Sequence, residues 1–265
     1  MKIKLGGLAV ITGAVLFSLA LPAHGQNPPT ATVNFTGITN GNIFGDGYVD
    51  PYAGTVKING VQVNPNGLIV CDDYNDNIYL PSETWNATAI QASTLGTTTP
   101  ITDALFGGAT LGYANIGVNG YAAVASLVSQ LLSLNSSVPA QAVTQGYLSG
   151  AIWYITSNGS IPFSYLNPIE QNFVTVAEAP FGGSSGIGQS SSAAISALGA
   201  DTTLWVLTPI LGTQSTGGRP QEMWTDPMSV PEGGAALLYL LLAGGVCFGA
   251  MFLSRRNRFA NLASA

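Results

Sequence analysis

Two long apolar segments, one near each end of the chain, constrain the fold more than any other feature of this sequence. The first runs from Leu5 to Leu21, and the second, Ala235 to Leu253, contains no charged side chain. A membrane-spanning helix needs about 20 predominantly apolar residues, so the second segment has the length of a transmembrane helix. The chain has 265 residues, and those between the two segments are expected to form its folded domain.

The N-terminal segment has the order of features found in secretory signal peptides. Lys2 and Lys4 precede the apolar run, and the small residues of Pro22–Gly25 follow it. This order predicts a signal peptide over residues 1–25, with cleavage before Gln26. An uncleaved N-terminal anchor is the alternative. The only histidine of the chain, His24, lies in the part that cleavage would remove.

The C-terminal segment lies between a short motif and a group of arginines. We predict a transmembrane helix over residues 235–253, and the arginines after it are of the kind that stay on the cytoplasmic side. Proline and glycine before the helix favour an extended segment that a protease can reach. The residues concerned are Val230, Pro231, Glu232, Gly233 and Gly234 before the helix, and Arg255, Arg256 and Arg258 after it.

The combination of a short motif with Pro and Glu, one apolar helix and a group of arginines resembles the PEP-CTERM sorting signal of Gram-negative bacteria. Gly233 stands where the family signature has a second proline, and the related VPDSG-type signal is matched at Val230, Pro231, Glu232 and Gly234. The resemblance implies that residues 230–258 are read by exosortase, a membrane-embedded cysteine transpeptidase. It also implies an inner-membrane-anchored precursor that later reaches the cell surface or the extracellular matrix, in association with exopolysaccharide and biofilm. A type I membrane anchor that is never cut is the alternative.

The segment between the ends is strongly acidic. We predict a single exported ectodomain over residues 26–229, which contain two basic and twelve acidic residues. A surface of this sign repels nucleic acid and anionic lipid headgroups, so nucleic acid is excluded as a partner. Only 8% of the whole chain is charged, against about a quarter in typical soluble domains.

The hydrophobic pattern predicts an α+β domain. It is β-rich, resembling an antiparallel sandwich or barrel, with an inserted helical hairpin, and one C-terminal transmembrane helix follows it. Alternation and short apolar runs indicate the strands, and Asn59-Gly60 is typical of a two-residue hairpin turn. The predicted strands are 31–35, 56–63 (a hairpin), 67–71, 77–80 and 202–208; the predicted helices are 113–134, 140–155, 169–177 and 192–198.

Two segments resemble the thioester domains of Gram-positive surface adhesins. Cys71 follows an apolar strand and precedes acidic residues, and Ser149 and Trp153 lie in a helical segment of matching pattern. In that family a glutamine occupies the position of Ser149 and forms a thioester with the cysteine. Gln145 lies one turn earlier on the same helical face. Because a hydroxyl cannot replace the amide, we predict that Cys71 is an inert core residue. A covalent adhesin using Gln145 is the alternative.

Acidic residues crowd the loop after Cys71. Asp72, Asp73 and Asp76 are oxygen donors of the kind that Ca²⁺ binds, and they are candidate calcium ligands. The alternative is a turn, since Asp and Asn hydrogen-bond to their own backbone in turns. No other cofactor is predicted.

The function predicted from these features is that of a non-enzymatic exported surface or matrix protein. Histidine-dependent catalysis is excluded if the signal peptide is removed. A carbohydrate-binding module is one alternative, with Trp85 and Trp224 as candidates for stacking on sugar rings because both have polar neighbours in the sequence. The thioester-type adhesin is a second alternative.

Overall fold

The computed structural model describes residues 29–39, 43–44, 47–48, 51–64, 67–73, 83–108, 113–157, 159–200, 203–210, 212–213 and 221–226. The predicted signal peptide, the predicted strand 77–80, Asp76 and the whole predicted sorting signal at 230–258 lie outside these residues. Within them, no helix has the length and apolar character needed to cross a bilayer.

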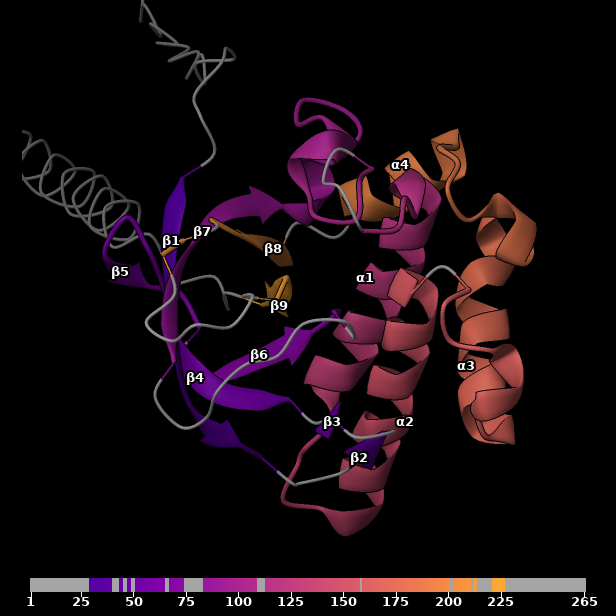
Figure 1. The fold of residues 1–265 in the computed structure, drawn as a ribbon, viewed down its shortest axis with the longest axis horizontal. Helices are drawn as coiled ribbons and strands as arrows, with labels where there is room; N and C mark the ends of the chain where they lie inside the picture. Colours follow the sequence, from indigo (N-terminus) through magenta and orange to yellow (C-terminus); the bar gives the residue numbers. More distant parts are fainter. Residues whose placement is uncertain are drawn as a thin grey trace, which may run out of the picture.

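The described strands form a closed antiparallel barrel of six strands (Figure 1). The last strand in the order pairs again with the first, so the barrel has no open edge at this point. The order is β1 (Thr30–Ile38), β7 (Thr84–Gln91), β8 (Trp205–Pro209), β9 (Met223–Thr225), β6 (Leu68–Cys71) and β4 (Tyr52–Ile58). A short strand, β5 (Val61–Gln62), extends the sheet beyond β4, and β2 (Ile43–Phe44) pairs with β3 (Gly47–Tyr48) separately.

Alternation with a period of two places apolar side chains inside the barrel. In β1, Ala31, Val33 and Phe35 are fully buried, and their neighbours in the strand are more exposed. The β4–β5 connection uses Asn59 and Gly60, both with positive φ angles of 51° and 83°. These angles are those of the hairpin turn that the Asn-Gly pair predicts.

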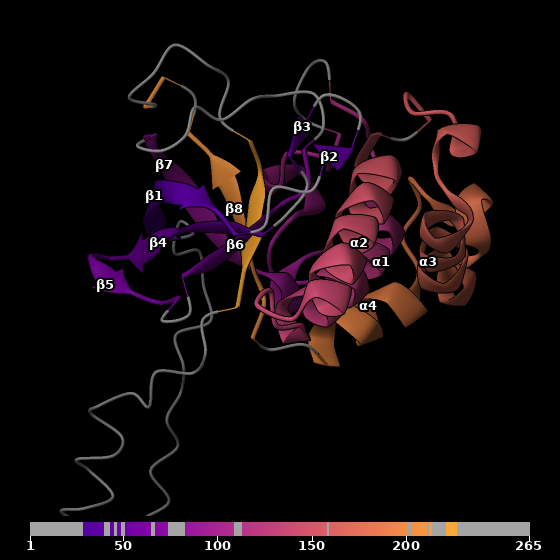
Figure 2. The ribbon, with the colours of Figure 1, turned by 90° about the horizontal axis from the view of Figure 1, so that it is seen from below.

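All four described α-helices come from one insertion between β7 and β8. Helices α1 (Gly117–Ser133) and α2 (Pro139–Ser157) lie side by side against the barrel, with α3 (Pro168–Glu178) outside them and α4 (Ser192–Ala200) along α1, next to the segment that follows β7 (Figures 1 and 2). Short 3-10 turns connect them to one another and to the barrel: η1 (Ala92–Thr94), η2 (Ile101–Asp103), η3 (Phe163–Tyr165), η4 (Ala179–Phe181) and η5 (Gly183–Gly186).

Helix α1 is the central element of this helical layer. It packs against α2, α3 and α4, and most of its side chains are buried, including Val124, Leu127 and Leu131. A helix that is apolar around most of its circumference is an interior helix, which explains the run of Ala, Val and Leu in this segment.

The structure confirms the α+β, β-rich class and the inserted helical hairpin. The sheet is a barrel, and the insertion holds two further helices where the two smaller ones were predicted. Strands β7 and β9 were not predicted. In β7, small alanines alternate with threonine and asparagine, and β9 is only three residues long. The predicted transmembrane helix lies outside the described residues and stays a prediction.

Candidate functional site

The candidate site residues meet where the end of β6 faces the helical layer. Asp72 and Asp73 follow β6, Glu222 precedes β9, and all three side chains are fully buried. We call these three residues the acid cluster. Aromatic side chains of α1, α2 and β9 surround it, namely Tyr121, Trp153 and Trp224.

Strand pairing sets the position of the acid cluster. Val70 pairs with Trp224 and Cys71 with Met223, so Asp72 lies opposite Glu222 on the neighbouring strand. The Asp72 backbone N–H donates to the Glu222 carbonyl over 3.4 Å. The pairing of a four-residue strand with a three-residue strand therefore brings two carboxyl groups together inside the fold.

Helix α2 is joined to the end of β6 by two hydrogen bonds. The Trp153 indole N–H donates to the Cys71 carbonyl at 3.0 Å, and the Thr156 hydroxyl donates to the Asp72 carbonyl. Both carbonyls belong to the chain as it leaves the barrel. The helix thus supplies donors to two backbone carbonyls at the buried end of β6.

Glu222 accepts hydrogen bonds at both of its carboxylate oxygens. Oε1 accepts from the Tyr121 hydroxyl at 2.6 Å, and Oε2 accepts from the Thr208 hydroxyl at 2.6 Å and the Leu105 N–H at 2.7 Å. The Tyr121 hydroxyl in turn accepts the Phe106 N–H at 2.9 Å. One buried carboxylate therefore links α1, β8 and the segment before α1.

Asp72 is the partner that holds a proton. Burial raises the pKa of Asp72 well above its usual value, and the nearby Glu222 carboxylate raises it further. Burial also raises the pKa of Glu222, but its hydrogen-bond donors oppose this rise. The two carboxyl groups lie close enough to change each other's pKa, and the Trp224 indole N–H donates to Asp72 Oδ2 at 2.6 Å. We therefore assign the pair as a neutral Asp72 beside a Glu222 carboxylate.

Cys71 has the environment of an unreactive thiol. It is buried, and burial raises the pKa of its thiol, with a further rise from the Asp73 and Asp72 carboxyl groups. Its sulfur lies 3.3 Å from both the N and the O of Asp73, so it hydrogen-bonds to the backbone of the turn after β6. The predicted burial of Cys71 is confirmed, and a raised pKa leaves little thiolate for nucleophilic attack.

The three other thioester-like positions all lie on α2. Ser149 is buried, and Trp153 contacts the Cys71 carbonyl as described above. The Gln145 carboxamide donates to the Leu131 and Leu134 carbonyls at 3.3 and 3.2 Å, so it satisfies acceptors at the C-terminal end of α1.

A different carboxamide is adjacent to the thiol. Gln221 Nε2 donates at 2.8 Å to the Asp73 carbonyl, the same oxygen that the Cys71 thiol contacts. Gln221 was not a predicted site residue. Its place follows from the register of β9, a strand too short for the hydrophobic pattern to indicate.

The prediction that Trp85 and Trp224 stack on sugars is wrong. Their exposed fractions are 1% and 0%, so neither ring presents a face to solvent. Trp85 stacks on Phe35 inside the barrel, with ring centroids 4.7 Å apart, and Trp224 donates to Asp72. The polar neighbours of Trp85 are half-buried residues on the opposite face of β7, whereas those of Trp224, Glu222 and Thr225, are themselves fully buried.

Only part of the predicted calcium ligand set lies in the described residues. Asp72 Oδ2 accepts a hydrogen bond from the Trp224 indole, and Asp76 lies outside the described residues. Among the residues that the structure describes, no three His, Cys, Asp or Glu side chains gather as metal ligands do. Calcium at the loop after Asp73 stays a prediction.

Comparison with protein-family models, curated proteins and solved structures finds no match for this chain. Its function is therefore argued from its own residues. In the described part of the chain, the contacts of the acid cluster are internal: they connect the segments next to β6 and β9 with β8, α1, α2 and the segment before α1.

Proposed function

We propose that this chain is a non-enzymatic exported protein of the cell surface or extracellular matrix, released from its membrane-anchored precursor by an exosortase-like transpeptidase. The observation that carries the proposal is the position of the barrel relative to the two predicted cleavage points. Strand β1 begins at Thr30, just after the predicted cut before Gln26, and β9 ends at Thr225, just before Val230. Cleavage at either point removes no described strand or helix.

The acid cluster supports the non-enzymatic part of the proposal. Glu222 is buried and receives three hydrogen bonds, and Asp72 is buried and accepts a hydrogen bond from Trp224. Carboxyl groups used in this way stabilise the junction between barrel and helices. They are positioned for internal contacts, since both side chains have an exposed fraction of 0%.

Association with exopolysaccharide is proposed to depend on the processed C-terminal region. The carbohydrate-binding alternative relied on Trp85 and Trp224, and both rings are buried. A domain with this acidic charge also repels polyanions, so a neutral or cationic polysaccharide is the more suitable matrix.

Processing is tested by changing the sorting motif in the full-length protein. Replacing Pro231 and Glu232 with alanine is expected to accumulate an unprocessed form in the inner-membrane fraction. A matched control replaces the adjacent Met228 and Ser229 with alanine and is expected to be processed normally. If the motif variant and the wild type fractionate alike, with the C-terminus intact in both, the chain is a plain membrane anchor and the proposal fails.

A further inference from the structure

The two acidic residues of the helical insertion lie at opposite ends of one helix. Between Asp103 and Asp201 the sequence contains no Lys or Arg and only two acids, Glu170 and Glu178. Glu170 lies in the first turn of α3, and Glu178 is the last residue of the helix. Both side chains are buried, with exposed fractions of 6% and 4%. The insertion therefore has no base of its own to pair with either acid.

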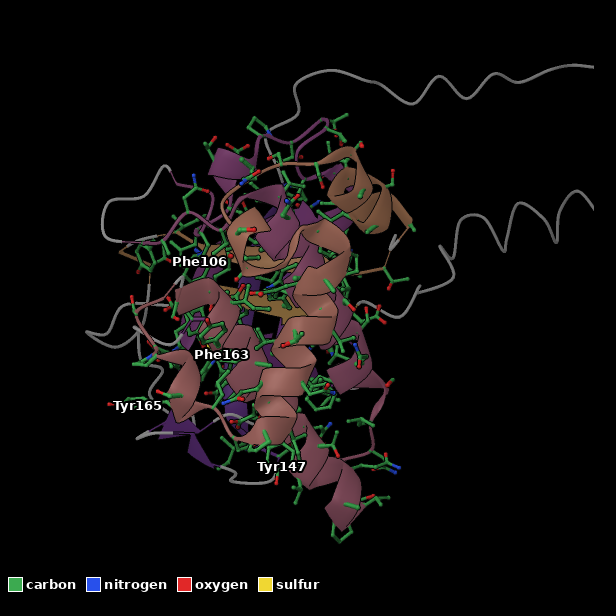
Figure 3. The ribbon with its side chains drawn as sticks, turned by 90° about the vertical axis from the view of Figure 1, so that its right-hand side faces the viewer. Phe106, Tyr147, Phe163 and Tyr165 are labelled. Atoms are coloured by element: carbon green, nitrogen blue, oxygen red, sulfur yellow. The ribbon has the colours of Figure 1, made fainter. Side chains whose placement is uncertain are left out.

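Glu170 is satisfied by its position at the start of α3. Its Oε2 accepts the Asn167 N–H at 2.7 Å, and the Asn167 side chain accepts two backbone N–H groups, which completes a capping box. The positive end of the helix dipole also stabilises a negative charge in this turn. Gln171 donates to the Phe163 and Leu166 carbonyls at 3.2 and 2.9 Å, so η3, whose Phe163 side chain is labelled in Figure 3, is held against the start of the helix.

Glu178 has none of these contacts. Within the described residues its carboxyl group accepts no hydrogen bond, and it lies at the end of α3 where the helix dipole is negative. Burial raises the pKa of Glu178 to about 7. A buried carboxylate that has neither a donor nor a cation is costly, so this position favours the neutral acid.

The groups that face Glu178 carry no positive charge. Of the elements that pack against α3, helix α2 contains Tyr147 and Tyr154, and the pKa of Tyr154 is raised by burial and then by the Glu178 carboxylate. Helix α1 contains Tyr121, whose hydroxyl is bonded within the acid cluster, and η4 and η5 contain no titratable residue. In the described part of the chain the one basic side chain is Lys57, on the exposed side of β4. Among these residues a Glu178 carboxylate would have no counter-ion.

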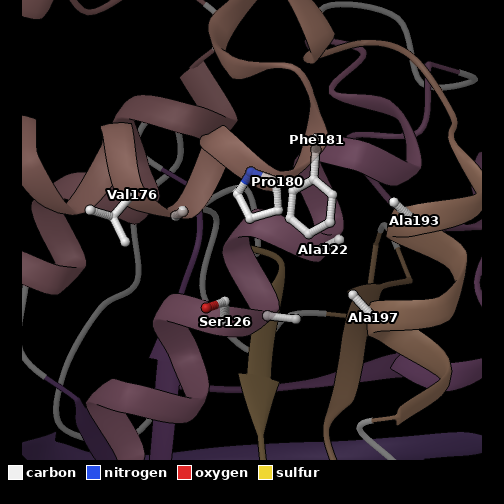
Figure 4. Close-up of a pocket in the computed structure, with 9 residues that line it drawn as sticks. Ala122, Ser126, Val176, Pro180, Phe181, Ala193 and Ala197 are labelled. Carbon is white, nitrogen blue, oxygen red and sulfur yellow. The ribbon is translucent and has the colours of Figure 1, made fainter.

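The packing beside the C-terminal end of α3 is incomplete. A groove of about 340 Å³ lies there, between α3 and α4 (Figure 4). Val176 and Ala177 of α3 line it with Pro180 and Phe181 of η4, and small residues of α1 and α4 complete it. Helix α3 packs on α2 and α1. Because the groove separates its last turns from α4, these turns can move at a smaller cost than the first turn, which is held by the capping box.

We propose that the C-terminal end of α3 is docked on α2 while Glu178 is uncharged, and that it is released when Glu178 loses its proton to solvent. Release moves the carboxylate into water and removes the cost of burying it. It also exposes the surface under the helix, including Val174 and Ala177, which are 1% and 5% exposed when α3 is docked. The start of α3 stays attached through its capping box. The proposal is independent of how the chain is sorted.

The direction of the pH dependence follows from the two states of Glu178. Its pKa is about 7 in the docked state and returns to the ordinary value of 4.5 once the side chain is in water. The docked state binds the proton more tightly, so docking is fully favoured below pH 4.5 and weakens as pH rises to about 7. The equilibrium constant for release should rise by about tenfold or more between pH 5 and pH 8.

Hydrogen exchange of the full-length protein in detergent, read by mass spectrometry and corrected for the intrinsic exchange rate at each pH, tests the proposal. Peptides covering 173–181 should lose protection by about tenfold or more from pH 5 to pH 8. Their exchange at pH 8 should be faster than that of α1 peptides and insensitive to low urea, because a local opening exposes little surface.

The two acids of α3 provide matched variants. Glu178→Gln cannot ionise and should make the protection of 173–181 independent of pH over this range. Glu170→Gln keeps the acceptor of the capping box and should leave the loss of protection at 173–181 in place. Protection of α1 peptides reports that each variant is folded.

Three results would overturn the proposal. The first is protection of 173–181 in the wild type that does not fall between pH 5 and pH 8. The second is a fall that persists in Glu178→Gln. The third is exchange of 173–181 at the α1 rate with the same sensitivity to urea, which would mean that α3 opens only when the whole domain unfolds. The wild-type measurements decide the first and the third even if a variant does not fold.

Discussion

The barrel and the helical layer are stabilised by different means. In the barrel two buried acids approach each other, and Glu222 accepts hydrogen bonds from donors of β8 and α1. In the helical layer the buried Gln145 joins α2 to the end of α1 without a charge, and the two acidic residues of the layer are buried near the ends of α3. The contrast indicates that buried acids fix how the two regions join, whereas uncharged groups hold the helices to one another.

The largest effect is expected from the core of the barrel. Trp224→Ala should lower the free energy of unfolding of the 26–229 domain by about 4–5 kcal/mol, because it removes a buried ring and the donor to Asp72. Trp205→Ala, on the paired strand β8, is the control, and it should cost less because that ring is only partly buried. Urea unfolding measures both. Equal losses of unfolding free energy in the two variants would mean that the full burial of Trp224 adds nothing to stability beyond what the partly buried Trp205 contributes.

The acid cluster should matter more than the acid that caps α3. Glu222→Ala should cost about 3–4 kcal/mol, since it leaves Tyr121, Thr208 and the Leu105 N–H without their acceptor. Glu170→Ala removes one side of a capping box and should cost about 1 kcal/mol. A larger loss for Glu170→Ala than for Glu222→Ala in the same unfolding assay would contradict this comparison of the two regions.

The domain should be more stable in mild acid than in mild base. Burial raises the pKa of Asp72 well above 3.8 and that of Glu178 to about 7, so the folded state binds these protons more tightly than the unfolded state. The unfolding free energy should therefore fall as pH rises from about 4 through 7.

Two conservative variants assign this pH dependence to one region or the other. Asp72→Asn keeps an acceptor for Trp224 but has no titratable group, and it should remove the part of the pH dependence that comes from the barrel. Glu178→Gln should remove the part of the pH dependence that comes from the helical layer. Unfolding measured across pH 4–8 checks both, and stability that increases with pH in the wild type would contradict the assignment of a neutral Asp72.

The smallest effect is expected at Cys71. Cys71→Ala should cost about 1 kcal/mol through lost packing, without changing localisation or matrix association. The wild-type thiol should alkylate only after unfolding, because it is buried and its pKa is raised. Rapid alkylation of the folded domain would show that the junction between barrel and helices opens at Cys71.

The sequence predicted the elements with strong patterns and missed those defined by pairing. The Asn59-Gly60 turn, the strand ending at Cys71 and all four helices were predicted because their periodicity or turn chemistry is local. Strand β9 was not predicted, because three residues are too few to show an alternating hydrophobic pattern. Its position is set by its pairing with β6 and β8.

This omission also explains the errors in the candidate site. The sequence pattern suggests that Trp224 is exposed because it does not reveal β9. It gives no reason to place Glu222 beside Asp72, because the two residues are distant in sequence. A buried pair of carboxyl groups requires both strands in register, which a single sequence does not reveal. The burial of Cys71, by contrast, was predicted from the apolar run that precedes it.

Intact-mass measurement of the protein isolated from the cell envelope tests the central claim most directly, because it reads both ends of the chain and Cys71 together. The account predicts a mass that begins at Gln26, lacks residues 235–265 and shows no loss of ammonia. A mass that retains the C-terminal arginines would contradict processing. A deficit equal to one ammonia, absent in Cys71→Ala and in either Gln145→Ala or Gln221→Ala, would instead establish a thioester and make the protein a covalent adhesin.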